Sequence, residues 1–265
     1  MDKPYVHDAL VHNLQAPREI VPILIEMFSP KSVVDVGCGL GTFLRVFMEN
    51  GITDVSGLDG SWVDKNLLSE NLPLECFREV NLEDFIQADR KFDMALCLEV
   101  AEHLPKCKAN NIVSTLINLS DIIIFSAAIP NQGGQNHVNE QWPTYWEELF
   151  NAHNYLMYDV IRPKIWDNSN IFFWYKQNIF VYVRKGHKRN SLTDNPSSMI
   201  RNVVHPDLFN LQCNALVDAQ KKLIYVDGQL EKLVSGDSPL KLYLNVITRY
   251  VIKKIHKILH CTRSN

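Results

Sequence analysis

Three glycines at alternate positions follow a run of β-branched residues and could bring a ligand against bare backbone. They are Gly37, Gly39 and Gly41, and the run before them, Val33–Val36, contains Asp35. Glycine permits positive φ and carries no Cβ, so the chain can turn tightly and a ligand can lie directly on the peptide groups. The G-x-G-x-G spacing differs from the G-x-G-x-x-G dinucleotide fingerprint, whose helix N-terminus receives a pyrophosphate. The turn therefore disfavours NAD or FAD.

A polar side chain follows each of the next three predicted strands. Those strands are residues 54–58, 75–79 and 92–98, and the side chains after them are Asp59, Asn81 and Glu99. Because ligands of an open α/β sheet bind beyond the carboxyl ends of its strands, we expect all three to border one cleft. Asp59 can accept hydrogen bonds from two ribose hydroxyls, or it can be an ordinary turn aspartate. Asn81 can present a carbonyl acceptor to a base, or it can cap a helix over residues 82–88.

In this order the segments resemble the motifs of class I S-adenosylmethionine (SAM)-dependent methyltransferases. The resemblance covers about residues 17–184 and includes the segment Phe92–Pro105, with its Glu-His-Leu. It implies an α/β fold, Rossmann-like and doubly wound, with a mostly parallel seven-stranded sheet, an antiparallel C-terminal hairpin, and SAM as the cofactor. Family members with unrelated acceptors share the histidine, here His103, so a structural role for it is as plausible as a catalytic one.

The resemblance also implies a set of cofactor contacts. These are Asp35, Gly37, Cys38, Gly39, Gly41, Asp59, Asn81, Leu82 and Glu99. Asp35 would anchor the methionyl ammonium, and the glycine turn would contact the amino-acid and ribose parts of SAM. Asn81 stands where the family usually has an aspartate near the adenine, and Leu82 would offer its backbone amide there.

A polar loop after the fifth predicted strand, residues 130–142, is where we place the acceptor. Methyl transfer from a sulfonium is an in-line displacement, so the protein must align the reactants and, for a hydroxyl acceptor, remove a proton. His137 is the candidate base because an imidazole titrates near neutrality. Glu140 could orient His137 or act as the base itself. The alternatives are that His137 only ties the loop together and that Glu140 faces a helix dipole.

Aromatic and basic residues further along could line an acceptor site. The aromatic ones, which are more often core residues, are Trp142, Tyr145, Trp146, Trp166, Trp174 and Tyr175. Arg162 and Lys164 could meet an anionic acceptor, although solvated surface charge is the ordinary role of such residues. No group of His, Asp and Glu has metal-ligand spacing, so the sequence predicts no metal site.

The favoured function is methylation of a small-molecule or saccharide acceptor, most simply at oxygen. Residues 137–178 resemble methyltransferases of bacterial cell-surface polysaccharide gene clusters, which implies a role in polysaccharide biosynthesis. A nucleic-acid methyltransferase is an alternative, but residues 1–183 are acidic and lack a basic stripe for phosphates. A non-catalytic SAM-binding scaffold protein is the third possibility.

The elements that must position these residues alternate between short apolar runs and amphipathic stretches, which is typical of βαβ units. The predicted strands are 32–36, 54–58, 75–79, 92–98 and 121–127, followed by a hairpin of 171–174 with 178–184. The predicted helices are 17–28, 41–50, 110–119, 142–152, 206–234 and 239–261. We therefore divide the chain into a methyltransferase domain over 1–184, a polar linker over 185–205 and a helical tail over 206–265.

The tail is basic, whereas the rest of the chain is acidic. Residues 184–265 hold 14 Lys and Arg against 6 Asp and Glu, although the net charge of the whole chain is only −3. The last helix could lie on an anionic membrane surface, pack on the body, or form a homodimer with a second copy. No stretch reaches the roughly 18 apolar residues that cross a bilayer, and no signal peptide is evident, so we expect a cytoplasmic protein able to contact the inner membrane face.

Overall fold

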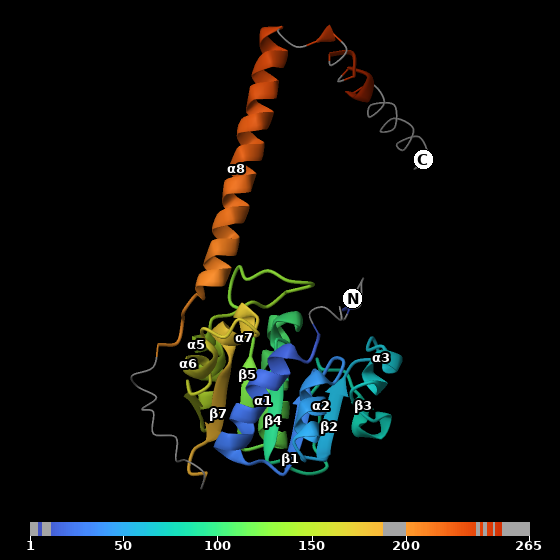
Figure 1. Cartoon of the computed structure of the whole chain (residues 1–265), viewed down its shortest axis with the longest axis vertical. Helices are drawn as coiled ribbons and strands as arrows, with labels where there is room; N and C mark the ends of the chain where they lie inside the picture. Colours follow the sequence, from blue (N-terminus) through green and yellow to red (C-terminus); the bar gives the residue numbers. More distant parts are fainter. Residues whose placement is uncertain are drawn as a thin grey trace. The chain divides into compact units, whose positions relative to one another are not determined.

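The computed structural model describes residues 5–6, 12–187, 200–236, 239–240, 243–245 and 247–250 (Figure 1). The chain divides into two compact units, residues 1–208 and 209–265. The first unit carries the sheet and the candidate site. The second consists, where described, of helix.

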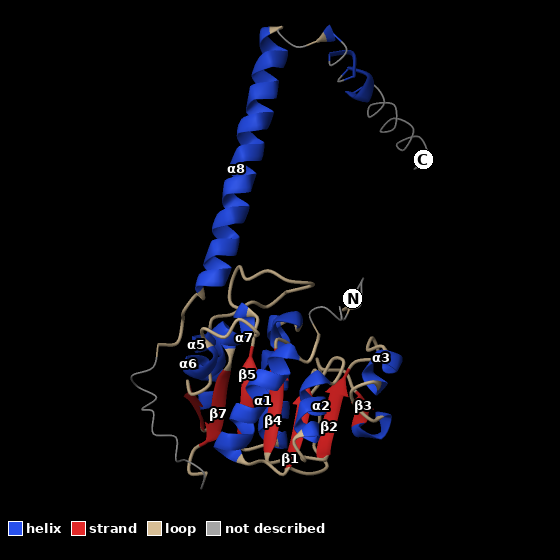
Figure 2. Ribbon diagram, in the orientation of Figure 1, coloured by secondary structure: helices blue, strands red, loops and turns tan. Residues whose placement is uncertain are grey.

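The first unit is built on a seven-stranded sheet with the order β3-β2-β1-β4-β5-β7-β6 (Figure 2). Its strands are β1 (Ser32–Val36), β2 (Asp54–Asp59), β3 (Phe77–Glu79), β4 (Met94–Leu98), β5 (Ile122–Ser126), β6 (Tyr155–Tyr158) and β7 (Phe180–Arg184). The first five pair in parallel, and β7 lies antiparallel between β5 and β6. The expected mostly parallel sheet with an antiparallel C-terminal hairpin is confirmed.

Helices cover both faces of this sheet. They are α1 (Gln15–Phe28), α2 (Thr42–Glu49), α3 (Lys65–Ser69), α4 (Ala109–Leu119), α5 (Pro143–Asn151), α6 (Arg162–Ile165) and α7 (Phe173–Asn178), with short 3-10 turns at Leu74–Cys76, Ala101–His103 and Lys106–Lys108. Neighbouring strand residues point to opposite faces, so Val33 joins the core under α1 and α2, and Val34 joins the core under α4 and α5. Strands β1, β4 and β5 are buried along their whole length, as central parallel strands must be.

The predicted hairpin is wrong in one of its two strands. The partner of β7 is β6, whereas residues 171–174 lead into α7. A four-residue apolar run carries no period that separates strand from helix. Here Ile171 is buried in the core, and the rings of Phe172 and Trp174 stack with centroids 4.3 Å apart.

The helix over residues 82–88, which was the alternative reason for Asn81 as a cap, is absent. Asn81 Oδ1 accepts a hydrogen bond from the Glu83 amide 3.2 Å away, which makes a local turn. The Ile86 amide donates to Thr115 Oγ1 at 3.0 Å rather than to a carbonyl one turn back. A bond to α4 thus replaces the helical bond, and only the tertiary fold supplies that partner.

The chain after β7 returns to the first unit before the long helix begins. The Ile200 and Arg201 carbonyls accept hydrogen bonds from Arg162, and the Lys176 ammonium lies 3.1 Å from the Asp207 carboxylate. Residues 200–208 therefore belong to the compact unit, although the sequence predicts a linker up to residue 205. Residues 188–199, the middle of that predicted linker, lie outside the described residues.

The predicted helix over 206–234 is present as α8 (Pro206–Ser235). The described residues between 240 and 250 are helical as well, and the rest of the predicted last helix lies outside the described residues. Apolar side chains along α8 are exposed, including Leu216, Leu223 and Leu230. No helix in the described part of the chain is long and apolar enough to cross a bilayer.

Candidate functional site

A cavity of about 1090 Å³ opens at the carboxyl ends of β1, β2 and β4. One end is formed by the glycine turn and the other by the loop between β5 and α5. Residues from seven distant segments reach its wall: Tyr5, His12, Asp35, Gly37, Cys38, Gly39, Asp59, Trp62, Leu82, Glu83, Glu99, Glu102, His103, Gln132, His137, Trp174 and Tyr175 are among them. The cavity lies where an open α/β sheet is expected to bind its ligand.

The glycine turn has a backbone that a side chain would disrupt. Gly37, Gly39 and Gly41 all have positive φ, of 82°, 51° and 75°. A Cβ on Gly37 would stand 2.3 Å from Val100 Cγ2, and one on Gly41 would stand 2.9 Å from Leu72 Cβ. The first two glycines line the cavity, whereas Gly41 lies behind it at the start of α2. The turn thus brings the cavity against backbone that carries no side chain at residues 37 and 39, while the amides of residues 37–39 donate to the Leu58 carbonyl and to Asp59.

Asp59 both shapes this turn and faces the cavity. Its Oδ2 accepts a hydrogen bond from the Gly39 amide at 2.8 Å, and its Oδ1 accepts one from the Gly60 amide at 2.6 Å. Burial raises its pKa to about 6. Burial, and then the charge of Asp59, raise the pKa of Asp35 to about 7. Two buried carboxyls in contact with the cavity provide a binding site for positive charge.

Glu99 lines the cavity and is held there by amide side chains. It has a φ of 55°, which is rare for a residue other than glycine, and its amide donates to the Ser126 carbonyl at 3.0 Å. Asn178 Nδ2 donates to Glu99 Oε1 at 3.1 Å, and Gln132 Nε2 donates to Oε2 at 3.0 Å. A non-glycine residue in this conformation, fixed by several bonds, is typical of a functional site.

The two predicted catalytic residues contact each other. His137 Nδ1 lies 3.0 Å from Glu140 Oε1, and Glu140 also accepts hydrogen bonds from the Asn131 and Gly133 amides at 2.7 and 2.9 Å. Glu140 therefore fixes both the loop and the ring of His137. His137 lines the cavity and Glu140 stands behind it, so Glu140 orients the imidazole.

The cavity wall is acidic. Among its described residues are Asp35, Asp59, Glu83, Glu99 and Glu102, and none is lysine or arginine. Low dielectric and like charges make such a wall unfavourable for a phosphate and favourable for a cation. SAM, with its sulfonium and ammonium groups, has the matching charge.

Several residues singled out in the sequence lie away from the cavity wall. Asn81 is exposed, and its Nδ2 donates to Asp84 Oδ2 at 2.8 Å. Arg162 is buried, with Nη2 2.6 Å from Asp159 Oδ2, so it is a structural residue rather than a surface charge. Lys164 is exposed. Of the six candidate aromatic residues, Trp174 and Tyr175 line the cavity, and Trp146 is in the core.

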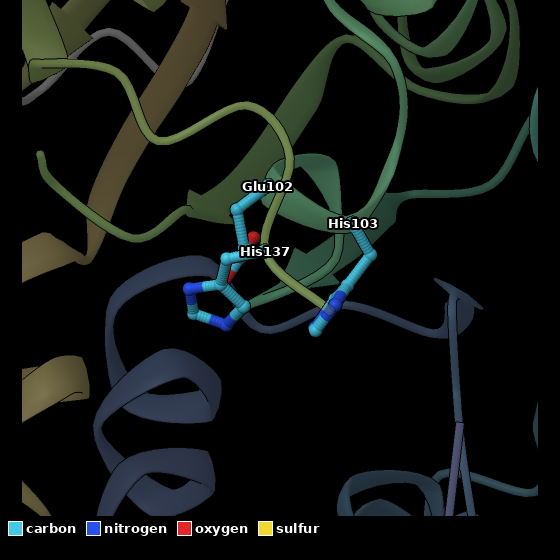
Figure 3. A group of neighbouring side chains, drawn as sticks. All are labelled: Glu102, His103 and His137. Atoms are coloured by element: carbon cyan, nitrogen blue, oxygen red, sulfur yellow. The ribbon is translucent and has the colours of Figure 1, made fainter. Parts of the chain in front are cut away.

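The fold also brings together residues that spacing in the sequence does not connect. Glu102 and His103, on the 3-10 turn after β4, lie beside His137, as Figure 3 shows. The rings of the two histidines pack edge to face with centroids 4.8 Å apart. Gln132 and Asn178, the partners of Glu99, were not identified from the sequence either. For this cluster the sequence offered one signal, the Glu-His-Leu segment, and in it Glu102 was noted only as part of a motif.

Comparisons with known proteins agree with this geometry. A family model described as a methyltransferase domain matches residues 11–156. A ubiquinone biosynthesis O-methyltransferase of Actinobacillus pleuropneumoniae serotype 5b (strain L20) is 34% identical over 84 residues, which cover 28% of this chain and 36% of that protein. One from Pasteurella multocida (strain Pm70) is 31% identical over 90 residues, with the same shares covered. The chain thus matches about a third of the length of these curated relatives.

Solved structures resemble the fold over a longer stretch. Magnesium protoporphyrin IX methyltransferase from Synechocystis PCC 6803, with bound SAH, is 17% identical with a TM-score of 0.50, over 69% of this chain and 89% of that one. A sugar N-methyltransferase from Streptoalloteichus sp. ATCC 53650 is 13% identical with a TM-score of 0.51, over 69% and 97%. At these identities the likeness concerns the fold alone.

Proposed function

Because this chain belongs to the methyltransferase-domain family and has the class I fold of SAM-dependent methyltransferases, we propose that it methylates a hydroxyl of an uncharged small-molecule or saccharide acceptor. The observation that carries the proposal is the cavity itself. It runs from the glycine turn and Asp59 to His137, and its described wall has five carboxyl groups and no lysine or arginine.

The cofactor end of the cavity suits SAM. A carboxylate has about four acceptor sites, so Asp59 can accept hydrogen bonds from ribose hydroxyls besides those from the Gly39 and Gly60 amides and from Trp62. Asp35 lines the cavity and would pair with the methionyl ammonium. The backbone at Gly37 and Gly39, which carries no side chain, would pack against the amino-acid part.

The acceptor end suits removal of a proton from a hydroxyl. The imidazole of His137 faces the cavity and is oriented by Glu140, which is the arrangement that a general base needs. Oxygen as the acceptor atom is also consistent with the two curated relatives, both of which are named O-methyltransferases. The aromatic side chains of Trp174 and Tyr175 would contact the ring of a sugar or a phenol.

The acidic wall disfavours a polyanionic acceptor. A nucleic acid needs lysine or arginine near its phosphates, and none lies on the described cavity wall. The sequence left open two other functions, a nucleic-acid methyltransferase and a non-catalytic SAM-binding protein. One experiment distinguishes both from the proposed function.

That experiment combines binding and turnover. Purified protein is titrated calorimetrically with SAM, with S-adenosylhomocysteine and with NADH as a control. It is then incubated with SAM and either a hydroxylated ring compound, a neutral saccharide or an RNA oligonucleotide, while S-adenosylhomocysteine release is measured. We expect binding of the first two ligands and turnover on a hydroxyl acceptor. A folded protein that binds no SAM, or that turns over only with RNA, would contradict the proposal.

A further inference from the structure

Three side chains with metal-binding atoms meet at the acceptor end of the cavity. Glu102 and His103 come from the 3-10 turn after β4, His137 comes from the loop after β5, and one ligand atom from each lies within 4.8 Å of the others (Figure 3). Two ligands of a cation bound at about 2.1 Å lie at most about 4.2 Å apart. Side-chain rotations that move these atoms by less than about 1 Å would therefore bring all three within bonding distance.

Glu102 lies in surroundings that suit a metal ligand. Its side chain is 0% exposed, and neither carboxylate oxygen has a hydrogen-bond partner of acceptable geometry. A buried carboxyl group without hydrogen bonds is unfavourable as an anion unless it is paired with a positive charge or coordinates a metal, and otherwise it takes up a proton. No lysine or arginine on the described cavity wall can pair with it.

The two histidines are suited to complete such a site. Nδ1 of His103 is buried without a hydrogen-bond partner. An imidazole nitrogen that no protein group occupies can ligate a metal when the ring is neutral. The contact between His137 Nδ1 and Glu140 Oε1 resembles the outer-shell carboxylate that orients a metal-bound histidine.

We propose that Glu102, His103 and His137 bind a divalent transition-metal cation of the Mn²⁺ or Zn²⁺ class, which holds the acceptor oxygen in front of the SAM methyl group. Two imidazoles and one carboxylate favour such a cation over Mg²⁺ or Ca²⁺, which prefer shells of oxygen. Three protein ligands leave coordination positions for the acceptor and for water. Glu99 needs no cation, since Asn178 and Gln132 already donate to it.

The inference rests on the proposed methylation of a hydroxyl, and it replaces His137 as the general base of that reaction by a metal-bound hydroxyl. Coordination of the acceptor hydroxyl to the cation would lower the pKa of that hydroxyl, and its proton would pass to solvent. The oxygen lone pair then forms the new bond to the methyl carbon while the carbon–sulfur bond breaks, which leaves neutral S-adenosylhomocysteine. In this arrangement His137 is a ligand, and no general base is needed, because the cation would lower the pKa of the hydroxyl and water would take up its proton.

The test is metal binding by the full chain, measured without an acceptor. Protein treated with EDTA and dialysed is titrated calorimetrically with Mn²⁺, Zn²⁺ and Mg²⁺, and Co²⁺ absorption reports the ligand set. Glu102→Gln keeps the shape of the side chain, and Glu148→Gln, at an exposed glutamate of α5, is its matched control. His137→Gln, on a loop, carries the same test if Glu102→Gln fails to fold, with His153→Gln as the exposed control.

We expect one Mn²⁺ or Zn²⁺ to bind per chain, and Mg²⁺ to bind at least about 10-fold more weakly. In Glu102→Gln and His137→Gln the affinity for Mn²⁺ or Zn²⁺ should fall by at least about 100-fold, whereas the two controls should keep it. Absence of saturable binding, or equal binding by the cluster variants and their controls, would overturn the site. Methyl transfer that EDTA leaves unchanged would overturn the role of the cation while the proposed function stands. Metal binding without turnover on any acceptor would instead contradict the proposed function.

Discussion

Replacement of Asp59 by asparagine separates the two roles of this carboxylate. In the protein its two oxygens accept hydrogen bonds from the amides of Gly39 and Gly60, at 2.8 and 2.6 Å. Asparagine has a single acceptor oxygen, so its NH₂ group must face one of these donors. One buried amide then loses its partner, which costs about 1–3 kcal/mol of unfolding free energy.

An opposing effect keeps the folded variant stable. Burial raises the pKa of Asp59 from its usual 3.8 to about 6. Because the folded pKa is the higher one, wild-type protein loses stability as the pH rises through this range, by about 3 kcal/mol at pH 8. Asparagine carries no charge and avoids this loss. We therefore expect the two proteins to differ in unfolding free energy by less than about 2 kcal/mol at pH 8.

The affinity for SAM should fall much further than the stability. A hydrogen bond to a charged group contributes about 1.5–3 kcal/mol, so loss of one charge-assisted bond to the ribose raises the dissociation constant by about 10-fold to 150-fold. The wild-type protein should itself bind SAM more weakly below pH 6, where Asp59 becomes protonated, and the variant should show less of this dependence.

Calorimetric titration with SAM at pH 8 and pH 5.5, together with urea unfolding, measures both quantities. The matched control is Asp64→Asn: Asp64 Oδ1 caps α3 through the amides of Asn66 and Leu67, at 2.9 and 3.3 Å, and asparagine caps helices equally well. The control should bind SAM as the wild type does. A folded Asp59→Asn protein whose dissociation constant at pH 8 lies within twofold of the wild-type value would refute the assignment of Asp59 to the ribose.

Three further substitutions test other parts of the first unit. Arg162→Met breaks a buried ion pair with Asp159 and should lower the unfolding free energy by about 3–5 kcal/mol in urea titrations, while a loss below about 1 kcal/mol would mean that the pair is not structural. Asp35→Asn should flatten the dependence of the unfolding free energy on pH between pH 4 and 8. The pKa of Asp35 is raised to about 7 in the folded wild-type protein, so the unfolding free energy of the wild type falls by up to about 4 kcal/mol as the pH rises through that value. Parallel curves for the two proteins would contradict this. Gly37→Ala places a Cβ against Val100 at positive φ, and calorimetry should show SAM bound at least about 10-fold more weakly; unaltered binding would show that the turn tolerates the shift.

Elements with a strong local signal could be predicted from the sequence. Strand β1 begins and ends where the apolar run Ser32–Val36 does, and α2 follows the glycine turn directly. Such elements depend on residues that are near in the chain, since periodicity and glycine conformations are local properties. Residues 171–174 have no such period, and their conformation is decided by the core against which Ile171 packs.

The site divides in the same way. The glycine turn and Asp59 lie within about one βαβ unit, so their spacing in the sequence was enough to predict a nucleoside pocket. Asn178 contacts Glu99 across 79 residues, and it does so because β7 runs antiparallel to β5, with Phe180 opposite Phe125. That direction returns the residues before β7 to the sheet edge where the parallel strands end.

What the sequence by itself determined is therefore the glycine turn, the strand ends that follow it and the kind of cofactor they suit. The tertiary structure alone decided that Glu102, His103 and His137 meet in one cavity. Residues 103 and 137 are separated by a helix and a strand, so the distance between their side chains depends on strand order and on the path of the loop. The physical reason is that sequence spacing constrains neighbours within one element, whereas contacts between elements follow from how the sheet buries both of its faces.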